Sequence, residues 1–158
     1  MNDNNLSADN RTLTMSEVMT PDMANFHGNV HGGHILKMLD RVAYACAARY
    51  SGKYIVTLSV DQVIFKEPIH VGELVSFHAN INFVGKSSME VGIRVIAEDL
   101  ITRKIRHTNT CYFTMVALDK KGKPTAVPPL KAETETEIRR HKEALLRKQA
   151  RLDIKSRS

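Results

Sequence analysis

Residues 25–40 read NFHGNVHGGHILKMLD, and this stretch decides how the fold is interpreted. It begins as a polar loop, and Gly32-Gly33 then opens an apolar helix that we expect to run to about Tyr50. Asp40 is the only carboxylate on that helix. An ionised carboxylate in apolar surroundings costs free energy unless it is paired or used, so Asp40 is a candidate for chemistry.

The start of the same helix is a second candidate. Its first backbone N–H groups have no partner within the helix, and they lie at the positive end of the helix dipole. Because glycine lets a ligand approach the backbone closely, we predict that Gly32 and Gly33 donate to an oxyanion. A carboxylate and aimed N–H donors together suit the transfer of an acyl group to water.

Residues 11–19 predict a short first strand, and four later runs, at 54–65, 73–84, 88–98 and 104–118, alternate between apolar and polar residues. Period-two alternation of this length predicts antiparallel strands with one buried face. In the run at 54–65 we expect the buried face to carry the following residues: Tyr54, Val56, Leu58, Val60 and Ile64. The order of elements predicts an α+β architecture, with a five-stranded antiparallel sheet wrapped around one long helix. An open sheet edge is expected to pair with a second copy.

The two ends of the chain differ from this central part. Residues 1–10 are polar, without an apolar signal core, and we predict that they are disordered. Residues 131–158 are basic and contain an expected surface helix at 133–152. Its apolar positions are seven residues apart, at Ile138, Leu145 and Leu152, so the helix would cover little core and pack on the surface or on a neighbouring chain.

Composition narrows the class of protein. A chain of 158 residues predicts one domain, and no apolar run is long enough to cross a membrane. Cys46 and Cys111 form no C-x-x-C pair, so we expect buried thiols in a reducing cytoplasm.

The net charge of the chain is +6, which suits either binding of an anionic ligand or a solvated helix face. His27, His31 and His34 have no obvious further ligand nearby, so no metal site is predicted.

Several short segments resemble hotdog-fold acyl-CoA thioesterases, above all the cytosolic acyl-CoA hydrolases and the bacterial YciA-type enzymes. The segments are PDMAN at 21–25, GNVHGG at 28–33, ILKMLD at 35–40, FKEPI at 65–69 and VG at 71–72. They occur in order at fitting spacings, so the resemblance covers roughly residues 11–130. It does not clearly extend to the basic tail at 131–158.

The resemblance implies a hotdog domain, a double-hotdog dimer that is often joined into a trimer of dimers, and hydrolysis of acyl-CoA without a cofactor. It assigns the catalytic roles to Asn25 and Asp40. Asn25 would orient the water or the carbonyl, and Asp40 would act as base or nucleophile. His31 is expected to line the thioester pocket. The turn formed by Lys86, Ser87 and Ser88 is expected to bind a coenzyme A phosphate through N–H groups, hydroxyls and charge.

Helix geometry adds a constraint on how these groups can meet. Asp40 follows Gly33 by seven residues, which is about 10 Å along one helix. A reacting carbon must lie near about 3 Å from both the base and the oxyanion donors. We therefore predict a site shared by two subunits, with Asn25 and Asp40 supplied by different chains.

Two other functions remain open at this point. A hotdog hydratase or dehydratase would need a second acid or base, for which His27 or His31 is available. A basic nucleotide- or RNA-binding protein is supported only by the charge of residues 131–158. Aromatic residues make up just 6% of the chain and tryptophan is absent, so bases would find few stacking surfaces and nucleic acid is an unlikely partner.

Overall fold

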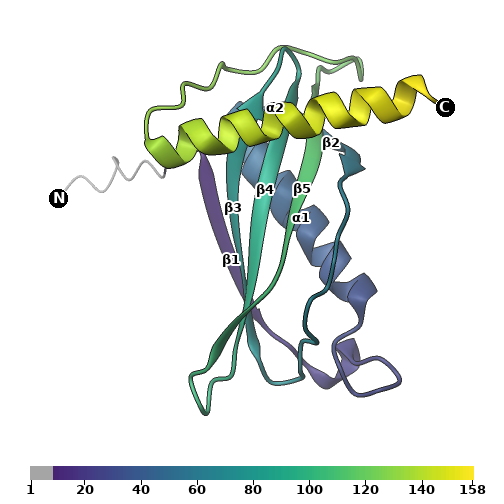
Figure 1. Cartoon of the computed structure of the whole chain (residues 1–158), viewed down its shortest axis with the longest axis vertical. Helices are drawn as coiled ribbons and strands as arrows, with labels where there is room; N and C mark the ends of the chain where they lie inside the picture. Colours follow the sequence, from purple (N-terminus) through teal and green to yellow (C-terminus); the bar gives the residue numbers. More distant parts are fainter. Residues whose placement is uncertain (1–8) are drawn as a thin grey trace.

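The computed structural model describes residues 9–158, so the prediction for residues 1–10 falls mostly outside the described residues. The elements, in chain order, are β1 (Thr12–Val18), the short 3₁₀ helix η1 (Pro21–Met23), α1 (Gly32–Ser51), β2 (Tyr54–Val60), β3 (Leu74–Val84), β4 (Ser88–Glu98), β5 (Ile105–Leu118) and α2 (Glu135–Ser156). The strands form one antiparallel sheet in the order β1-β3-β4-β5-β2. Helix α1 lies on one face of this sheet and α2 crosses the other (Figure 1). The predicted five-stranded sheet around one long helix is confirmed.

Helix α1 begins and ends with specific caps. The ring Nδ1 of His31 accepts the backbone N–H of Gly33 at 3.0 Å, which satisfies one of the free donors at the helix start. At the other end Gly52 takes the left-handed conformation, with φ of 65°, and its N–H donates to the Ala48 carbonyl. The helix therefore ends at Ser51, within one residue of the end predicted near Tyr50.

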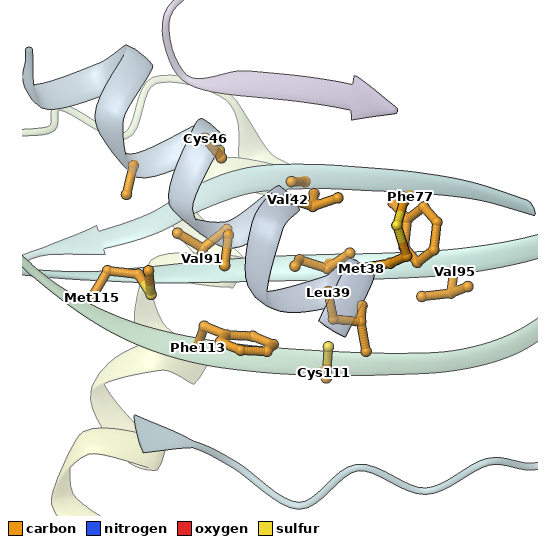
Figure 2. Packing of buried hydrophobic residues seen from close by; sticks show 14 of the residues in the cluster. Met38, Leu39, Val42, Cys46, Phe77, Val91, Val95, Cys111, Phe113 and Met115 are labelled. Carbon is orange, nitrogen blue, oxygen red and sulfur yellow. The ribbon is translucent and has the colours of Figure 1, made fainter. Parts of the chain in front are cut away.

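The core lies between α1 and the sheet. Side chains of α1 such as Met38, Leu39 and Val42 interdigitate with residues of β3, β4 and β5 (Figure 2). The thiols of Cys46 and Cys111 are part of this core, and burial raises the pKa of each to about 12. Both cysteines are thus neutral, buried side chains, as expected.

The predicted face of the second strand run was wrong. Ile55 is buried, with 3% of its surface exposed, whereas Leu58 is 68% exposed and Tyr54 and Val60 are also exposed. Ile55 and Thr57 point toward α1, so the apolar face chosen from the pattern is the one that residues 9–158 leave largely exposed. The strand also ends at Val60 rather than at residue 65, after a register shift between Thr57 and Ser59.

The two edges of the sheet have different chemistry. The β2 edge continues into exposed Ile64 and Phe65, which makes it apolar. The β1 edge exposes mainly Thr12, Thr14 and Ser16. An apolar edge strand with unpaired backbone groups is a template for pairing with another chain, so β2 is the edge that favours association.

Helix α2 is attached to the sheet by charge rather than by its apolar stripe. It starts at a capping box formed by Thr134 and Glu137. Arg147 donates to Glu90 at 2.6 Å and lies over the Tyr112 ring at 3.6 Å, and Arg151 donates to Asp61 at 2.6 Å. Asp61 therefore has a structural role, since it helps to hold α2 against the sheet.

The apolar stripe of α2 is left exposed. Ile138, Leu145 and Leu152 all remain accessible, so the expectation of a surface helix that covers little core is confirmed. The helix extends to Ser156, four residues beyond the predicted end. Among residues 9–158, no helix is long and apolar enough to cross a membrane.

Replacing Leu39 by alanine tests the packing of α1. Leu39 is fully buried, so the cavity and the lost transfer free energy should lower the free energy of unfolding by about 3 kcal/mol. Leu146→Ala on the exposed side of α2 is the control and should change it by less than about 0.5 kcal/mol. Urea unfolding at one fixed protein concentration measures both. Equal losses for the two variants would contradict this packing.

The attachment of α2 can be tested at Glu90, which is only 2% exposed. Arg147→Met leaves this carboxylate without its main counter-charge and should lower the free energy of unfolding by about 3 kcal/mol. Adding Glu90→Gln should recover at least half of the loss. Arg139→Met breaks an exposed pair with Glu143 and should cost less than about 0.5 kcal/mol. Additive effects of the first two substitutions would show that the ion pair is not what holds α2.

Candidate active site

Asn25 lies in a loop that its own side chain closes. The side-chain Oδ1 accepts the backbone N–H groups of His27 at 2.9 Å and Asn29 at 3.1 Å. The backbone N–H of Asn25 donates to the Asn29 carbonyl, and Ala24 forms an isolated bridge with Val30. Gly28 completes the turn with φ of 80°, a conformation that favours glycine. Because Oδ1 is engaged twice within the loop, the Nδ2 amide group of Asn25 is the part available to a ligand.

Asn25 and Gly32 line one surface depression of about 190 Å³. Its other walls include Phe65, Glu67 and Ile69 from the segment after β2. The Gly32 Cα faces the Phe65 ring, and a Cβ added there would lie 3.5 Å from Cε2. For the Gly32 N–H, no acceptor is found within residues 9–158. The depression thus combines two hydrogen-bond donors with apolar walls.

The other predicted donor and the predicted pocket histidine are already engaged with each other. The N–H of Gly33 donates to His31, whose ring serves as the cap of α1. His31 does not line the depression. Of the two glycines, Gly32 is the one whose N–H has no acceptor among residues 9–158, and the ligand contacts expected for Gly33 and His31 stay predictions.

Asp40 lies on the exposed face of α1, not among the buried side chains of that helix. The hydroxyl of Thr57 in β2 donates to Asp40 Oδ1 at 2.6 Å. This bond fixes the carboxylate and leaves Oδ2 free of partners within residues 9–158. Sequence reasoning missed Thr57, because nothing in the alternation of β2 says which residue of α1 it faces.

Asp40 and Gly32 do not converge within one chain. Helix α1 is continuous between them, which separates the two residues by about 12 Å along its axis. Asp40 lies beside the apolar β2 edge, whereas the Asn25 loop lies at the N-terminal end of α1 (Figure 1). The chain therefore carries two half-sites: a donor pair at Asn25 and Gly32, and a carboxylate at Asp40.

The predicted phosphate contacts lie at the far end of the sheet. Lys86 and Ser87 form the turn between β3 and β4, and Ser88 begins β4. The other end of β3 adjoins the end of β1 near the Asn25 loop. Because β3 has 11 residues, the two ends lie about 35 Å apart. The structure thus holds Lys86–Ser88 away from Asn25 and Gly32 of the same chain, whereas Ser88 shares a surface cavity with Leu58 and Ser59 of β2, next to Thr57.

An ion-pair cluster that the sequence did not reveal supports the depression. Arg106 of β5 donates to Glu73 at 2.6 Å, to Glu67 at 2.9 Å and to the Pro68 carbonyl at 2.9 Å. Glu73 is only 5% exposed, and its hydrogen bond to Arg106 is the main reason why the pKa of Arg106 is raised. The cluster fixes the segment that forms the outer wall. No local motif links these three positions in the sequence.

The histidines near the helix start do not assemble a metal site. Within residues 9–158, no group of three or more His, Cys, Asp or Glu side chains is arranged to hold a metal ion. His31 caps α1 and His27 is exposed at the tip of the loop.

This chain is similar to known proteins in both sequence and structure. The thioesterase superfamily model matches residues 27–103. Protein VdlD of Helicobacter pylori is 54% identical over 145 residues, which cover 92% of this chain and 83% of VdlD. A hexameric acyl-CoA thioesterase has a structure similar to this one, with a TM-score of 0.87, 32% identity and coverage of 90% of this chain and 91% of that chain.

A third similar protein is the acyl-CoA hydrolase of Staphylococcus aureus. Its complex with butyryl coenzyme A, coenzyme A and coenzyme A disulfide gives a TM-score of 0.82 at 31% identity, covering 92% of this chain and 90% of that chain. Solved variants of that protein replace one Asp, one Thr or one Asn by alanine. With this agreement in sequence and structure, the chain belongs to the thioesterase superfamily and has the hotdog fold, as its sequence motifs predicted.

Proposed function

We propose that this chain hydrolyses acyl-CoA thioesters to a free carboxylic acid and coenzyme A. The observation that carries the proposal is the bond from Thr57 to Asp40, which orients an exposed carboxylate with one oxygen left free. A carboxylate held in this way is prepared to accept a proton from water.

The proposed reaction uses both half-sites. Asp40 Oδ2 accepts a proton from water, and the resulting hydroxide attacks the thioester carbonyl carbon. The N–H of Gly32 and the Nδ2 group of Asn25 donate to the oxygen that becomes negatively charged. The carbon–sulfur bond then breaks, and the thiolate of coenzyme A takes the proton from Asp40. A direct attack by Asp40 gives the same products through an anhydride, and transfer of ¹⁸O from labelled water into Asp40 during one turnover would identify that route.

The half-sites would come from two subunits. Pairing of two β2 edges about a two-fold axis places Asp40 of each chain near the interface, because Asp40 is bonded to β2 itself. This arrangement removes the problem that Gly32 and Asp40 of one chain are about 12 Å apart. The hexameric thioesterase similar to this chain supports an assembly built from such dimers.

The Staphylococcus aureus variants support the same residues. The three positions replaced there are separated along that chain by the same intervals as Asn25, Asp40 and Thr57 here. We infer that Thr57 belongs to the catalytic set together with Asn25 and Asp40. We also propose that Lys86, Ser87 and Ser88 contact the phosphates of a substrate whose thioester lies at the Asn25 loop of another subunit, since about 35 Å separates them from the Asn25 loop of their own chain.

The alternative functions receive less support. A hydratase needs a second acid or base beside Asp40, and the partner found for Asp40 in residues 9–158 is a hydroxyl, not an imidazole. The basic α2 uses Arg147 and Arg151 in ion pairs with its own sheet, which reduces the charge available to RNA.

Substitutions at the two half-sites test the proposal. Asp40→Asn should lower kcat for butyryl-CoA at least about a hundredfold, because the base is lost. Asn25→Asp keeps the oxygen that closes the loop but removes the amide donor, so kcat should fall about a hundredfold without loss of thermal stability. Release of coenzyme A thiol, followed with a thiol reagent, measures both. Thr57→Val should have a smaller effect than Asp40→Asn. Native turnover by Asp40→Asn would end the proposal.

Mixed oligomers test whether the site is shared. Asn25→Ala and Asp40→Ala chains are each expected to retain only about one hundredth of the native turnover alone. A purified dimer that contains one chain of each kind should recover about half of the native turnover, because one of its two sites is complete. A dimer of the doubly substituted chain with a native chain provides the control, since it too keeps the native residues once but never in one shared site. No recovery in the first dimer would place Asn25 and Asp40 in the same chain's site.

A further inference from the structure

We propose that His70 and Asn29 are positioning residues that fix the amide of Asn25 for the reaction. The inference rests on the proposed function, in which Asn25 Nδ2 donates to the substrate. His70 and Asn29 do not touch the reacting atoms; they act through Asn25. Neither residue was singled out by the sequence.

The first step is the orientation of the Asn25 amide. Asn25 Oδ1 accepts two backbone N–H groups, from His27 and Asn29, and this determines which way Nδ2 points. The orientation therefore depends on where the Asn29 N–H lies. If Asn29 moves, one of the two bonds that hold the amide is lost, and the amide can rotate.

The second step is the position of Asn29. Its side-chain Oδ1 lies 3.0 Å from the ring Nδ1 of His70, and the two residues also form a backbone bridge. The neighbouring N–H of Val30 donates to the Ile69 carbonyl at 2.8 Å. With hydrogen on Nδ1, His70 donates to Asn29 whether the ring is neutral or protonated. Asn29 is thus tied by its side chain and its backbone to the segment that carries His70.

The third step is the anchor of His70 itself. Its backbone N–H donates to Glu73 Oε1 at 2.8 Å, and the same oxygen accepts from Arg106 at 2.6 Å. A buried carboxylate paired with arginine is a fixed point in the sheet. A continuous series of hydrogen bonds therefore runs from Arg106 on β5 through Glu73, His70 and Asn29 to Asn25.

This series explains why a flexible type of element can hold a catalytic amide. The loop from Ala24 to Val30 contains an exposed Phe26 and His27 and a glycine with positive φ, and little packs on its tip. Precise catalysis needs the donor fixed, because a misplacement of about 1 Å can cost up to about a hundredfold in rate. The side-chain and backbone bonds between His70 and Asn29 hold the C-terminal part of this loop in place, although its tip is not packed against other residues.

The test compares His70→Phe with His70→Asn. Phenylalanine keeps a planar ring but has no donor, so kcat for butyryl-CoA should fall about tenfold while KM changes less than about twofold. Asparagine places an amide N–H near the position of Nδ1 and should restore most of the activity. His78→Phe is the matched control, since His78 Nδ1 also lies near a side-chain oxygen, that of Thr14 at 3.2 Å, but on β3 and β1, outside the loop. It should keep native kcat.

A double-mutant cycle separates positioning from general loss of structure. In the Asn25→Ala background, His70→Phe should lower kcat no further, because the group that it positions is already gone. Asn29→Ala, which removes the side-chain acceptor but keeps the backbone N–H, is a second variant that should reproduce the tenfold loss if His70→Phe does not fold. Native kcat in both folded variants, or effects that multiply with Asn25→Ala, would overturn the inference.

The outcomes also distinguish this inference from the proposed function. If Asn25→Asp and Asp40→Asn retain native turnover, the proposed function fails and the inference fails with it. If those two variants are inactive while His70→Phe and Asn29→Ala are fully active, only the inference fails.

Discussion

The burial of one face of α1 against the curled sheet is the constraint on which the site depends. Residues such as Leu39 and Val42 hold the helix as a straight, continuous rod, so the distance between its start and Asp40 cannot shorten. The start offers a free N–H at Gly32, and the exposed face offers a carboxylate. Because both belong to one rigid body, a reaction that needs them together has to bring in a second copy of the helix.

Most of the fold could be predicted from the sequence, because its helix and most of its strands follow from local periodicity. Apolar spacing in α1, its glycine boundaries and the alternation of four strand runs follow from local periodicity, and the structure reproduces them to within a residue or two. The exception is β2. Its apolar alternation was taken for the buried face, although Ile55 and Thr57 are the residues that face α1. Periodicity shows that a strand has an apolar face, but not whether its own chain or another covers that face.

The site was predictable only in part, for a related reason. Asn25, Gly32 and Asp40 lie in one continuous motif, so the sequence pointed to them together. Thr57, His70 and Arg106 reach the same region from other elements, and their contacts depend on strand register and on loop closure. The bond from the Gly33 N–H to the ring of His31 was equally hidden in the sequence, because a capping bond depends on how the loop enters the helix.

The contrast between the two sheet edges has a consequence for how far assembly can proceed. When an edge strand pairs with the same strand of a second copy about a two-fold axis, both edges are buried in that one interface. In a dimer paired through β2, the two outer strands of the joined sheet are both β1. This strand exposes mainly threonine and serine side chains, so it offers little apolar surface to a further chain. Growth into a fibre would need a second apolar edge strand that pairs with another chain. Because the apolar residues of the sheet edges are concentrated at β2, a sheet paired through that edge would offer no second apolar edge strand for further pairing.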